Sequence, residues 1–351
     1  MGPACGPFAL QPSLLSCFGT PTILSAPRLG TWGRGEPGSG SAEKHQTALG
    51  PVRSPGPCDS MGTMTSDPPA TAAQDVARLS AALDATVPGK EASNLLIGTW
   101  NIRAFGDLTE KSAAGPRDSP KRDLHAMACI AEITSRCDAL ALQEVRRNTT
   151  ALHHLMGLLG PGWRFITSDV TEGSAGNGER LTYLYDTTRV QPSGLVGEIV
   201  LPPGTDGPVP QFARTPYAAG FTRGTAGFVL TSVHVLWGDR AAERLPELTA
   251  FAQWMQDWAE RPDDWNENLL VLGDFNLDRI GDPLYEAFVS TGLWAPTELD
   301  TVPRTIFDND KTRHFLRPDR LVLRTRRNQP APNPRIHRPG RAHRLPPPRL
   351  H

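Results

Sequence analysis

The stretch NLLVLGDFN, residues 268–276, is an apolar run that ends abruptly in polar side chains. Its unbroken aliphatic residues are typical of a strand that is buried on both faces. Gly273 closes the run, and Asp274 and Asn276 follow it. Taken alone, Asp-Phe-Asn is an ordinary turn sequence. The same arrangement recurs elsewhere in the chain, and this repetition favours a site over a simple turn.

Three more apolar runs end in polar side chains. The runs NLLIGTW, DALALQ and VLTSV lead directly into Asn101, Glu144 and His234. Each of these residues alone also fits a structural role, as a turn cap, a solvated strand end or a buried structural histidine. Because the strand ends of open α/β sheets are where sites are built, the whole set indicates one site. Carboxylates suit a hard cation, and Asn and His suit contacts with phosphate oxygens.

The segments between these strands predict a mixed α/β sandwich. RDLHAMACIAEITSRC carries apolar residues along one helical face, and another helix is expected from about Leu245, with Pro246 in its first turn. WRFITSDV, RLTYLYD and SGLVGEIVL are typical of strands separated by turn residues. Strands that are joined alternately by helices and by hairpins do not fit a simple doubly wound sheet.

The patterned part of the chain spans residues 93–315, and both ends differ from it. Residues 1–92 are interpreted as a disordered or mis-assigned extension, with a short helix expected at 72–87. Residues 316–351 hold ten Arg, one Asp and eight Pro, a composition that cannot fold alone. The remaining chain has 26 basic and 36 acidic residues, which argues against broad electrostatic binding to nucleic acid. The sequence leaves the true start open between Met1, Met61 and Met64.

The five cysteines do not suggest a disulfide framework. Cys5, Cys17 and Cys58 lie in the irregular head, whereas Cys129 and Cys137 lie in the patterned body, where buried thiols without a metal or redox role are expected. This usage favours a reducing compartment, and we expect a cytoplasmic protein. The head does not have the pattern of a signal peptide, and no apolar run is long enough to span a membrane.

Six motifs follow one another along the chain: GTWNIR, LQEV, ERLTYLYD, FARTPYAAGF, TSVHV and GDFNLD. Together they resemble the endonuclease/exonuclease/phosphatase superfamily, the deoxyribonuclease I-like group, over about residues 95–315. The resemblance implies an α/β fold, a four-layer α/β/β/α sandwich of two mixed sheets, whose last strands are missing or replaced in this chain. It also implies a metal-dependent phosphodiester hydrolase, with a nuclease as the leading interpretation.

The resemblance assigns roles to the residues at the strand ends. It implies that Glu144 binds Mg²⁺ or Mn²⁺ directly, with Asn101 and Asp274 beside it in the metal site. Asp274 is also expected to orient or help deprotonate the attacking water, and Asn276 to contact the phosphate. His234 is expected to steady the scissile phosphate. In such a site the metal stabilises charge on the phosphate while a base activates water for in-line attack.

Two further matches to the superfamily are looser. Arg214 of FARTPY corresponds to an arginine near the phosphate, although Arg180 competes with it for that role. Tyr185 of YLYD corresponds to a tyrosine of the superfamily and is included among the expected catalytic residues.

The superfamily also requires a strand that contains Asp and a closing Ser-Asp-His, whose His is the general base. RPDRLVL holds Asp319, but no Ser-Asp-His follows it. Bacterial members of the superfamily that resemble this chain often have the sequence KHFYDQIAWF at this point. A GC-rich coding sequence for YDQIAWF, read with one extra C before it, translates as LRPDRLV, the text of residues 316–322. We therefore interpret the chain from Leu316 onward as an out-of-frame reading, caused by a frameshift or by an error in the nucleotide sequence.

The expected substrate is a phosphate ester, with nucleic acid as the first choice, and the expected state is a monomer. A lipid or inositol phosphoesterase of the same fold is an alternative. Another is a phosphate-binding module that the loss of Ser-Asp-His has left catalytically dead. Loops outside the shared motifs set the substrate in this superfamily, so the sequence leaves DNA, RNA, lipid and inositol phosphate open.

Overall fold

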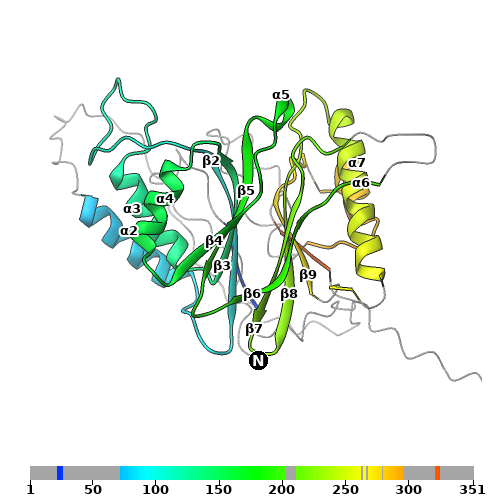
Figure 1. The fold of residues 1–351 in the computed structure, drawn as a ribbon, viewed down its shortest axis with the longest axis horizontal. Helices are drawn as coiled ribbons and strands as arrows, with labels where there is room; N and C mark the ends of the chain where they lie inside the picture. The colour runs from blue at the N-terminus through cyan, green and yellow to red at the C-terminus, as the bar shows by residue number, and fades with distance from the viewer. Residues whose placement is uncertain are drawn as a thin grey trace, which may run out of the picture.

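Two β-sheets packed face to face form the centre of the protein, and helices cover the outer face of each sheet (Figure 1). The structure is a computed structural model. It describes residues 22–26, 72–202, 211–261, 264–265, 268–278, 280–295 and 321–324. Each sheet combines parallel and antiparallel strand pairs, so the expected four-layer α/β/β/α sandwich of two mixed sheets is confirmed.

The first sheet has its two most apolar strands near its centre. Its strands lie in the order β1 (Thr22–Ala26), β2 (Leu95–Phe105), β3 (Ala139–Arg146), β5 (Glu179–Asp186) and β4 (Trp163–Thr167). Strands β2 and β3 are parallel, and the other neighbours pair antiparallel. Because β2 and β3 lie between two layers, most of their residues are buried, as their aliphatic runs require.

The second sheet repeats this plan with one parallel pair among antiparallel neighbours. Its strands lie in the order β10 (Leu321–Arg324), β9 (Leu269–Asp274), β8 (Ala226–His234), β7 (Tyr217–Arg223) and β6 (Gln191–Glu198). Strands β8 and β9 are the parallel pair. The apolar run within residues 268–276 thus forms the buried strand β9, as predicted.

Helices close the sandwich on both sides (Figure 1). They are α2 (Ala72–Thr86), α3 (Leu124–Ser135), α4 (Thr150–Leu159), the short α5 (Gly173–Gly176), α6 (Ala241–Glu260) and α7 (Pro283–Val289). Helices α2, α3 and α4 cover the first sheet, and α6 and α7 cover the second. Three apolar cores fill the spaces between the four layers, with Trp100, Tyr183 and Phe251 as their respective large buried members.

The helical layers differ from the sequence-based expectation in two places. Helix α6 begins at Ala241, so Pro246 lies beyond its first turn. Helix α4 was not expected, yet its Leu152 and Leu155 are fully buried in the core under the first sheet. A short helix such as α4 is marginal on its own, and its stability comes from this packing, which a local sequence pattern does not record.

The start of the domain expected at residue 93 is too late. Helix α2 lies where a helix was expected, but its Leu79 and Leu83 are buried in the same core as α3, so it belongs to the domain. Strands β1 and β10 lie in end segments for which no strand was expected. Each pairs with the outer side of β2 or β9, where an edge strand offers unpaired N–H and C=O groups. The other predictions about residues 1–71 and 316–351 fall outside the described residues.

The two cysteines of the described body are free thiols. Burial raises the pKa of Cys129 to about 11 and that of Cys137 to about 12. Both thiols are therefore protonated near neutral pH, where the thiolate would be the reactive form. In the described part of the chain, no helix is both long and apolar enough to cross a membrane.

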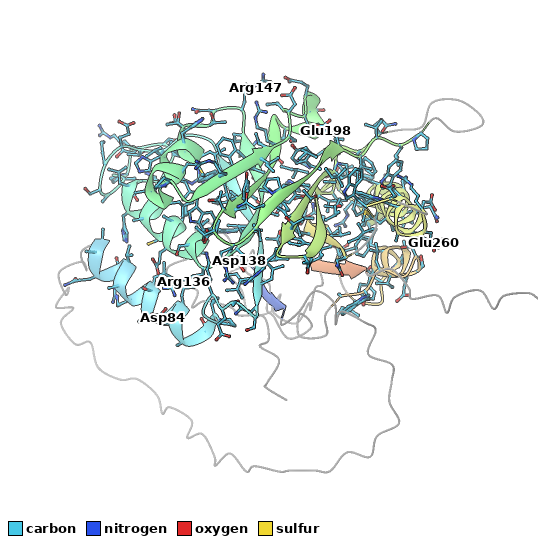
Figure 2. All side chains as sticks on the ribbon, turned by 60° about the horizontal axis from the view of Figure 1, so that its bottom comes forward. Asp84, Arg136, Asp138, Arg147, Glu198 and Glu260 are labelled. Carbon is cyan, nitrogen blue, oxygen red and sulfur yellow. The ribbon has the colours of Figure 1, made fainter. Side chains whose placement is uncertain are left out.

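A buried carboxylate ties the two sheets together at the end where β3 begins. Asp138 is fully buried, and its Oδ1 accepts a hydrogen bond from Arg189 Nε at 2.7 Å. Its Oδ2 accepts from Leu96 N at 2.9 Å and from Arg223 Nη1 at 3.1 Å. Arg223 ends β7 of the second sheet, so one charge holds strands of both sheets. Figure 2 shows Asp138 between the layers and the Asp84–Arg136 pair on the helical side.

Asp138→Asn should lower the free energy of unfolding by about 3–5 kcal/mol, because it leaves two partly buried guanidinium groups without their shared anion. Urea unfolding followed by circular dichroism measures this change. The control is Asp84→Asn, which removes a largely exposed carboxylate from an ion pair and should change stability by less than about 1 kcal/mol. Equal effects of the two substitutions would contradict the role given to Asp138.

Candidate active site

Two parallel strand pairs, one in each sheet, bring their carboxyl ends together. Asn101 of β2 lies opposite Gln143 of β3, and His234 of β8 lies opposite Asp274 of β9. A hydrogen bond of 2.9 Å from Asn101 Nδ2 to Asp274 Oδ2 joins the two sheets at these ends. Next to it the buried Gln143 donates from Nε2 to Ser232 Oγ at 3.0 Å, which also crosses between the sheets. The site is thus built on strand ends of both sheets.

The turn after β9 is fixed by backbone geometry. Gly273 has φ +138°, and a Cβ atom at this position would lie 2.0 Å from the carbonyl oxygen of Val233. Asp274 Oδ1 accepts a hydrogen bond from the backbone N–H of Asn276 at 3.1 Å. Asn276 is buried, and its Nδ2 donates to the Val235 carbonyl at 2.7 Å. The turn is therefore bonded to the end of β8 and cannot move away from it freely.

Glu144 stands in a strained part of the first sheet. Its φ is +64°, and the strand ladders on both sides of it shift register there. Across the ladder, Arg103 and Ala104 also have positive φ. Positive φ is unfavourable for residues other than glycine, and such strain concentrates at functional sites. Glu144 Oε2 accepts a hydrogen bond from Ala104 N at 2.8 Å, while Oε1 accepts none from the described residues.

A buried guanidinium holds the segment around Arg103 and Ala104, where the backbone has positive φ. Arg122 donates from Nη1 to the Ala104 carbonyl at 3.0 Å and from Nη2 to those of Ile102 and Arg103 at 3.1 and 2.7 Å. Burial lowers the pKa of Arg122 to about 10, and the negative charge of Glu144 acts in the opposite direction. Arg122 therefore remains charged at neutral pH and fixes the turn that positions Glu144.

Glu179 is a member of the site that the sequence analysis missed. Its side chain is buried, and Oε2 lies 2.9 Å from His234 Nδ1 and 2.6 Å from Arg214 Nε. Its Oε1 accepts a hydrogen bond from Asn177 Nδ2 at 2.7 Å. Burial alone would raise the pKa of Glu179, but the hydrogen bond and charge of His234, with Arg214, leave the pKa below its usual value. Among the described residues, Glu144, Glu179 and His234 have ligand atoms within 4.8 Å of one another.

The direction of β5 explains both this omission and the error at Tyr185. Because β5 is antiparallel to β3, its first residue, Glu179, lies opposite Arg146 at the site end. Tyr185 lies opposite Ala139 at the other end, where its ring packs edge-on against Phe221 at 5.5 Å. Tyr185 is therefore a core residue and not part of the site. In the sequence, Glu179 is marked only as the polar residue directly before the predicted strand RLTYLYD. Which end of the sheet it occupies depends on the direction of the neighbouring strands, which the segment does not show.

Of the two arginines that the sequence left open, Arg214 and not Arg180 lies beside Glu179. Arg146 is also close to the site, with Nη1 at 3.5 Å from Glu179 Oε1 and Nη2 at 3.8 Å from Glu144 Oε2. Arg214 forms the ion pair with Glu179 described above, and its Nη1 is buried without a hydrogen-bond partner in the described part of the chain. Arg180 instead donates to the Ser168 carbonyl at 2.8 Å and lies 3.4 Å from Asp169 Oδ1. The structure thus places Arg214 with Glu179 and His234, and directs Arg180 toward Ser168 and Asp169.

Glu247 of α6 anchors the two segments that carry Arg214 and His234. Its Oε1 accepts a hydrogen bond from Ala213 N at 3.3 Å, and its Oε2 accepts one from Leu236 N at 3.2 Å. Burial raises the pKa of Glu247, although these two N–H groups and the charges of Arg214 and His234 act in the opposite direction. The loop before β7 and the loop after β8 are thus anchored to the same helix.

Five of the expected site residues converge: Asn101, Glu144, His234, Asp274 and Asn276. Arg214 joins them, whereas Tyr185 does not. The segment in which the superfamily would carry its closing Ser-Asp-His lies outside the described residues, apart from β10 at the edge beside β9.

Comparison with known proteins identifies the family. Residues 98–343, more than half of the chain, match the endonuclease/exonuclease/phosphatase family. The chain belongs to this family. The match extends beyond Phe315 into the Arg/Pro-rich segment.

The individual relatives share less than a third of their aligned residues with this chain. A protein named deoxyribonuclease from Thioalkalivibrio sp. (strain K90mix) is 28% identical over 197 residues, which are 54% of this chain and 48% of that protein. The chain thus spans about half the length of this curated relative. Two solved structures, both 18% identical, are also similar. A functionally unknown conserved protein from Enterococcus faecalis V583 aligns with 65% of this chain and 86% of its own at a TM-score of 0.45. The human nocturnin catalytic domain with bound sulfate aligns with 55% and 72% at 0.41.

Glu179→Gln should lower the free energy of unfolding by about 3 kcal/mol at pH 7, because it leaves the buried Arg214 without its anion. The folded-state pKa of Glu179 is below 4.5, so its stabilisation is complete above pH 4.5 and is lost as the pH falls through the folded-state value. The stability difference between wild type and variant should therefore shrink below pH 4.5. Urea unfolding at a series of pH values measures this, and a difference independent of pH would contradict it.

Proposed function

We propose that this chain is a divalent-metal-dependent phosphodiester hydrolase that acts on nucleic acid. The observation that carries the proposal is the cross-sheet cluster, in which Glu144, Glu179 and His234 lie within 4.8 Å of one another beside the Asn101–Asp274 hydrogen bond. Membership of the family and the relative named deoxyribonuclease support the reaction class and the choice of substrate.

The oxygen donors of the site fit Mg²⁺ or Mn²⁺. Glu144 keeps its Oε1 without a hydrogen bond from the described residues, and a carboxylate oxygen is the ligand that such hard cations prefer. The side-chain oxygen of Asn101 accepts only the N–H of Arg103, at 3.1 Å, among the described residues. Asp274 adds a second carboxylate bonded to Asn101. A bound divalent cation would supply charge neutralisation at the phosphate and at the leaving oxygen.

The other side of the site is suited to hold the phosphate. His234 uses Nδ1 to contact Glu179, which leaves Nε2 available to a phosphate oxygen. Arg214 keeps its buried Nη1 without a partner in the described residues, and an unsatisfied buried donor of this kind is expensive unless a ligand accepts from it. Glu179 orients the side chains of both His234 and Arg214, so its own contribution is to position them and not to bind the phosphate.

Asp274 is suited to orient the attacking water. Each of its carboxylate oxygens already accepts one hydrogen bond, from Asn276 N and from Asn101 Nδ2, and each retains a lone pair for water. This arrangement can align a water but does not supply the closing His that the superfamily uses as general base. Residues 317–351 contain no Ser-Asp-His, and we therefore propose that hydrolysis by residues 1–351 in this reading frame is weak.

Restoring the reading frame at Leu316 should raise the rate of Mg²⁺-dependent cleavage by about 10²–10⁴-fold, which is the usual contribution of a general base. Cleavage of an end-labelled oligonucleotide by the printed and restored chains measures the difference. In the restored chain, Glu144→Gln should reduce the rate by about 10²-fold or more, because a charge-stabilising group is lost.

The matched control is Glu172→Gln, which removes a carboxylate that is 71% exposed and pairs with Arg147. This substitution should leave the cleavage rate unchanged. Addition of EDTA should abolish cleavage by the restored chain. Cleavage that persists in EDTA, or that Glu144→Gln does not slow, would contradict the proposed function.

A further inference from the structure

An exposed tryptophan lies on the loop that follows the active-site histidine. Trp237 comes three residues after His234, and 52% of its surface is exposed. A single exposed aromatic side chain is common on a protein surface, so it is the position of Trp237 beside the site, and not its exposure alone, that calls for an explanation. The ring is not a disordered surface group, because the loop around it is bonded on several sides.

Backbone hydrogen bonds on both sides of Trp237 tie its loop to helix α6. Leu236 N donates to Glu247 Oε2 at 3.2 Å, and Asp239 N donates to Glu243 Oε2 at 3.0 Å. Gly238 has φ +58°, a conformation that glycine adopts at little cost. The indole is therefore presented to solvent from a loop with little freedom, and a preorganised group loses little entropy when a ligand binds.

A guanidinium supports the ring and connects it to the site. The Cζ atom of Arg244 lies over the Trp237 ring, 5.8 Å from its centroid. Arg244 is buried, donates from Nη1 to the Asn276 carbonyl and pairs with Asp278 at 2.8 Å. The same guanidinium thus contacts the turn that carries Asp274 and Asn276 and the exposed indole. Trp237 is consequently held at a fixed place beside the proposed phosphate site.

A nucleobase is the ligand that this group fits best. An indole stacks on the flat face of any base, and such stacking tolerates every sequence. The polar residues that follow Trp237, namely Asp239 and Arg240, make a lipid tail a poor match, because a lipid tail requires a broad apolar surface. A sugar ring can also pack on an indole through its C–H groups, so the test has to compare a base-bearing strand with a sugar–phosphate strand that has no bases.

We propose that Trp237 is a stacking platform for a base next to the phosphodiester that the site binds, and hence a residue that selects nucleic acid over other phosphate esters. This inference rests on the proposed function. It deepens it by assigning substrate selection to a side chain that does not touch the reacting atoms.

The test measures, by fluorescence anisotropy, the binding of fluorescein-labelled single-stranded DNA to the protein of residues 1–351 in Mg²⁺ at low ionic strength. A second probe of the same length and charge has abasic sites in place of its bases. Trp237→Ala should weaken binding of the base-bearing strand about tenfold and leave binding of the abasic strand unchanged, because only a base can stack. Trp237→Phe should recover most of the affinity.

The matched control is Trp265→Ala. Trp265 is 56% exposed, but it precedes β9 and so lies at the end of that strand away from Asp274. This variant should bind both probes as the wild type does. Equal losses for both probes in Trp237→Ala, or no loss for either, would overturn the stacking role. Neither outcome would contradict the proposal that the site binds a phosphodiester. Failure of the wild type to bind even the abasic strand would instead count against the proposed function itself.

Discussion

The hydrogen bond from Asn101 to Asp274 is the contact on which the rest of the site depends, because it is where the two sheets meet at their functional ends. Each sheet contributes one parallel strand pair, and parallel strands place their carboxyl ends on the same side. Packing the sheets face to face then brings four strand ends into one small volume. Strands β2 and β3 supply the amide of Asn101 and the carboxylate of Glu144, and strands β8 and β9 supply the imidazole of His234 and the carboxylate of Asp274.

Charge balance is the second constraint on this volume. Glu179 carries its negative charge in a nearly dry environment and is stabilised there by His234 and Arg214. Asp138 solves the same problem at the opposite end of the sandwich, where Arg189 and Arg223 surround it. The two ends differ in whether all their buried polar groups have hydrogen-bond partners. Asp138 is fully satisfied and structural, whereas the group around Glu179 leaves Arg214 Nη1 without a partner in the described residues and is suited to receive an anion.

Much of the fold could be predicted from the sequence, because buried strands such as β3 and β9 are uninterrupted aliphatic runs with a clear end. The same signal located Asn101, Glu144, His234 and Asp274, each of which directly follows or ends such a run. Glu179 and Tyr185 could not be assigned in this way. Whether a residue of β5 faces the site or the far core depends on the direction of its neighbours, and that direction is a property of the sheet and not of the segment. Strands β1 and β10 were unexpected for a related reason, since their pairing is determined by the open edges of β2 and β9.

Gly273, which lies one residue before the end of β9, has an effect beyond its own turn. At Gly273 the two main chains of β8 and β9 approach so closely that a methyl group would collide with the Val233 carbonyl. The main chains that carry His234 and Asp274 are consequently held at a fixed spacing, and hydrogen bonds to Glu179 and Asn101 then orient the two side chains. Substitutions in the core beneath α6 can therefore lower the thermal stability of the protein while this main-chain spacing stays the same. The backbone of the candidate site and the composition of the core are in this sense free to evolve at different rates.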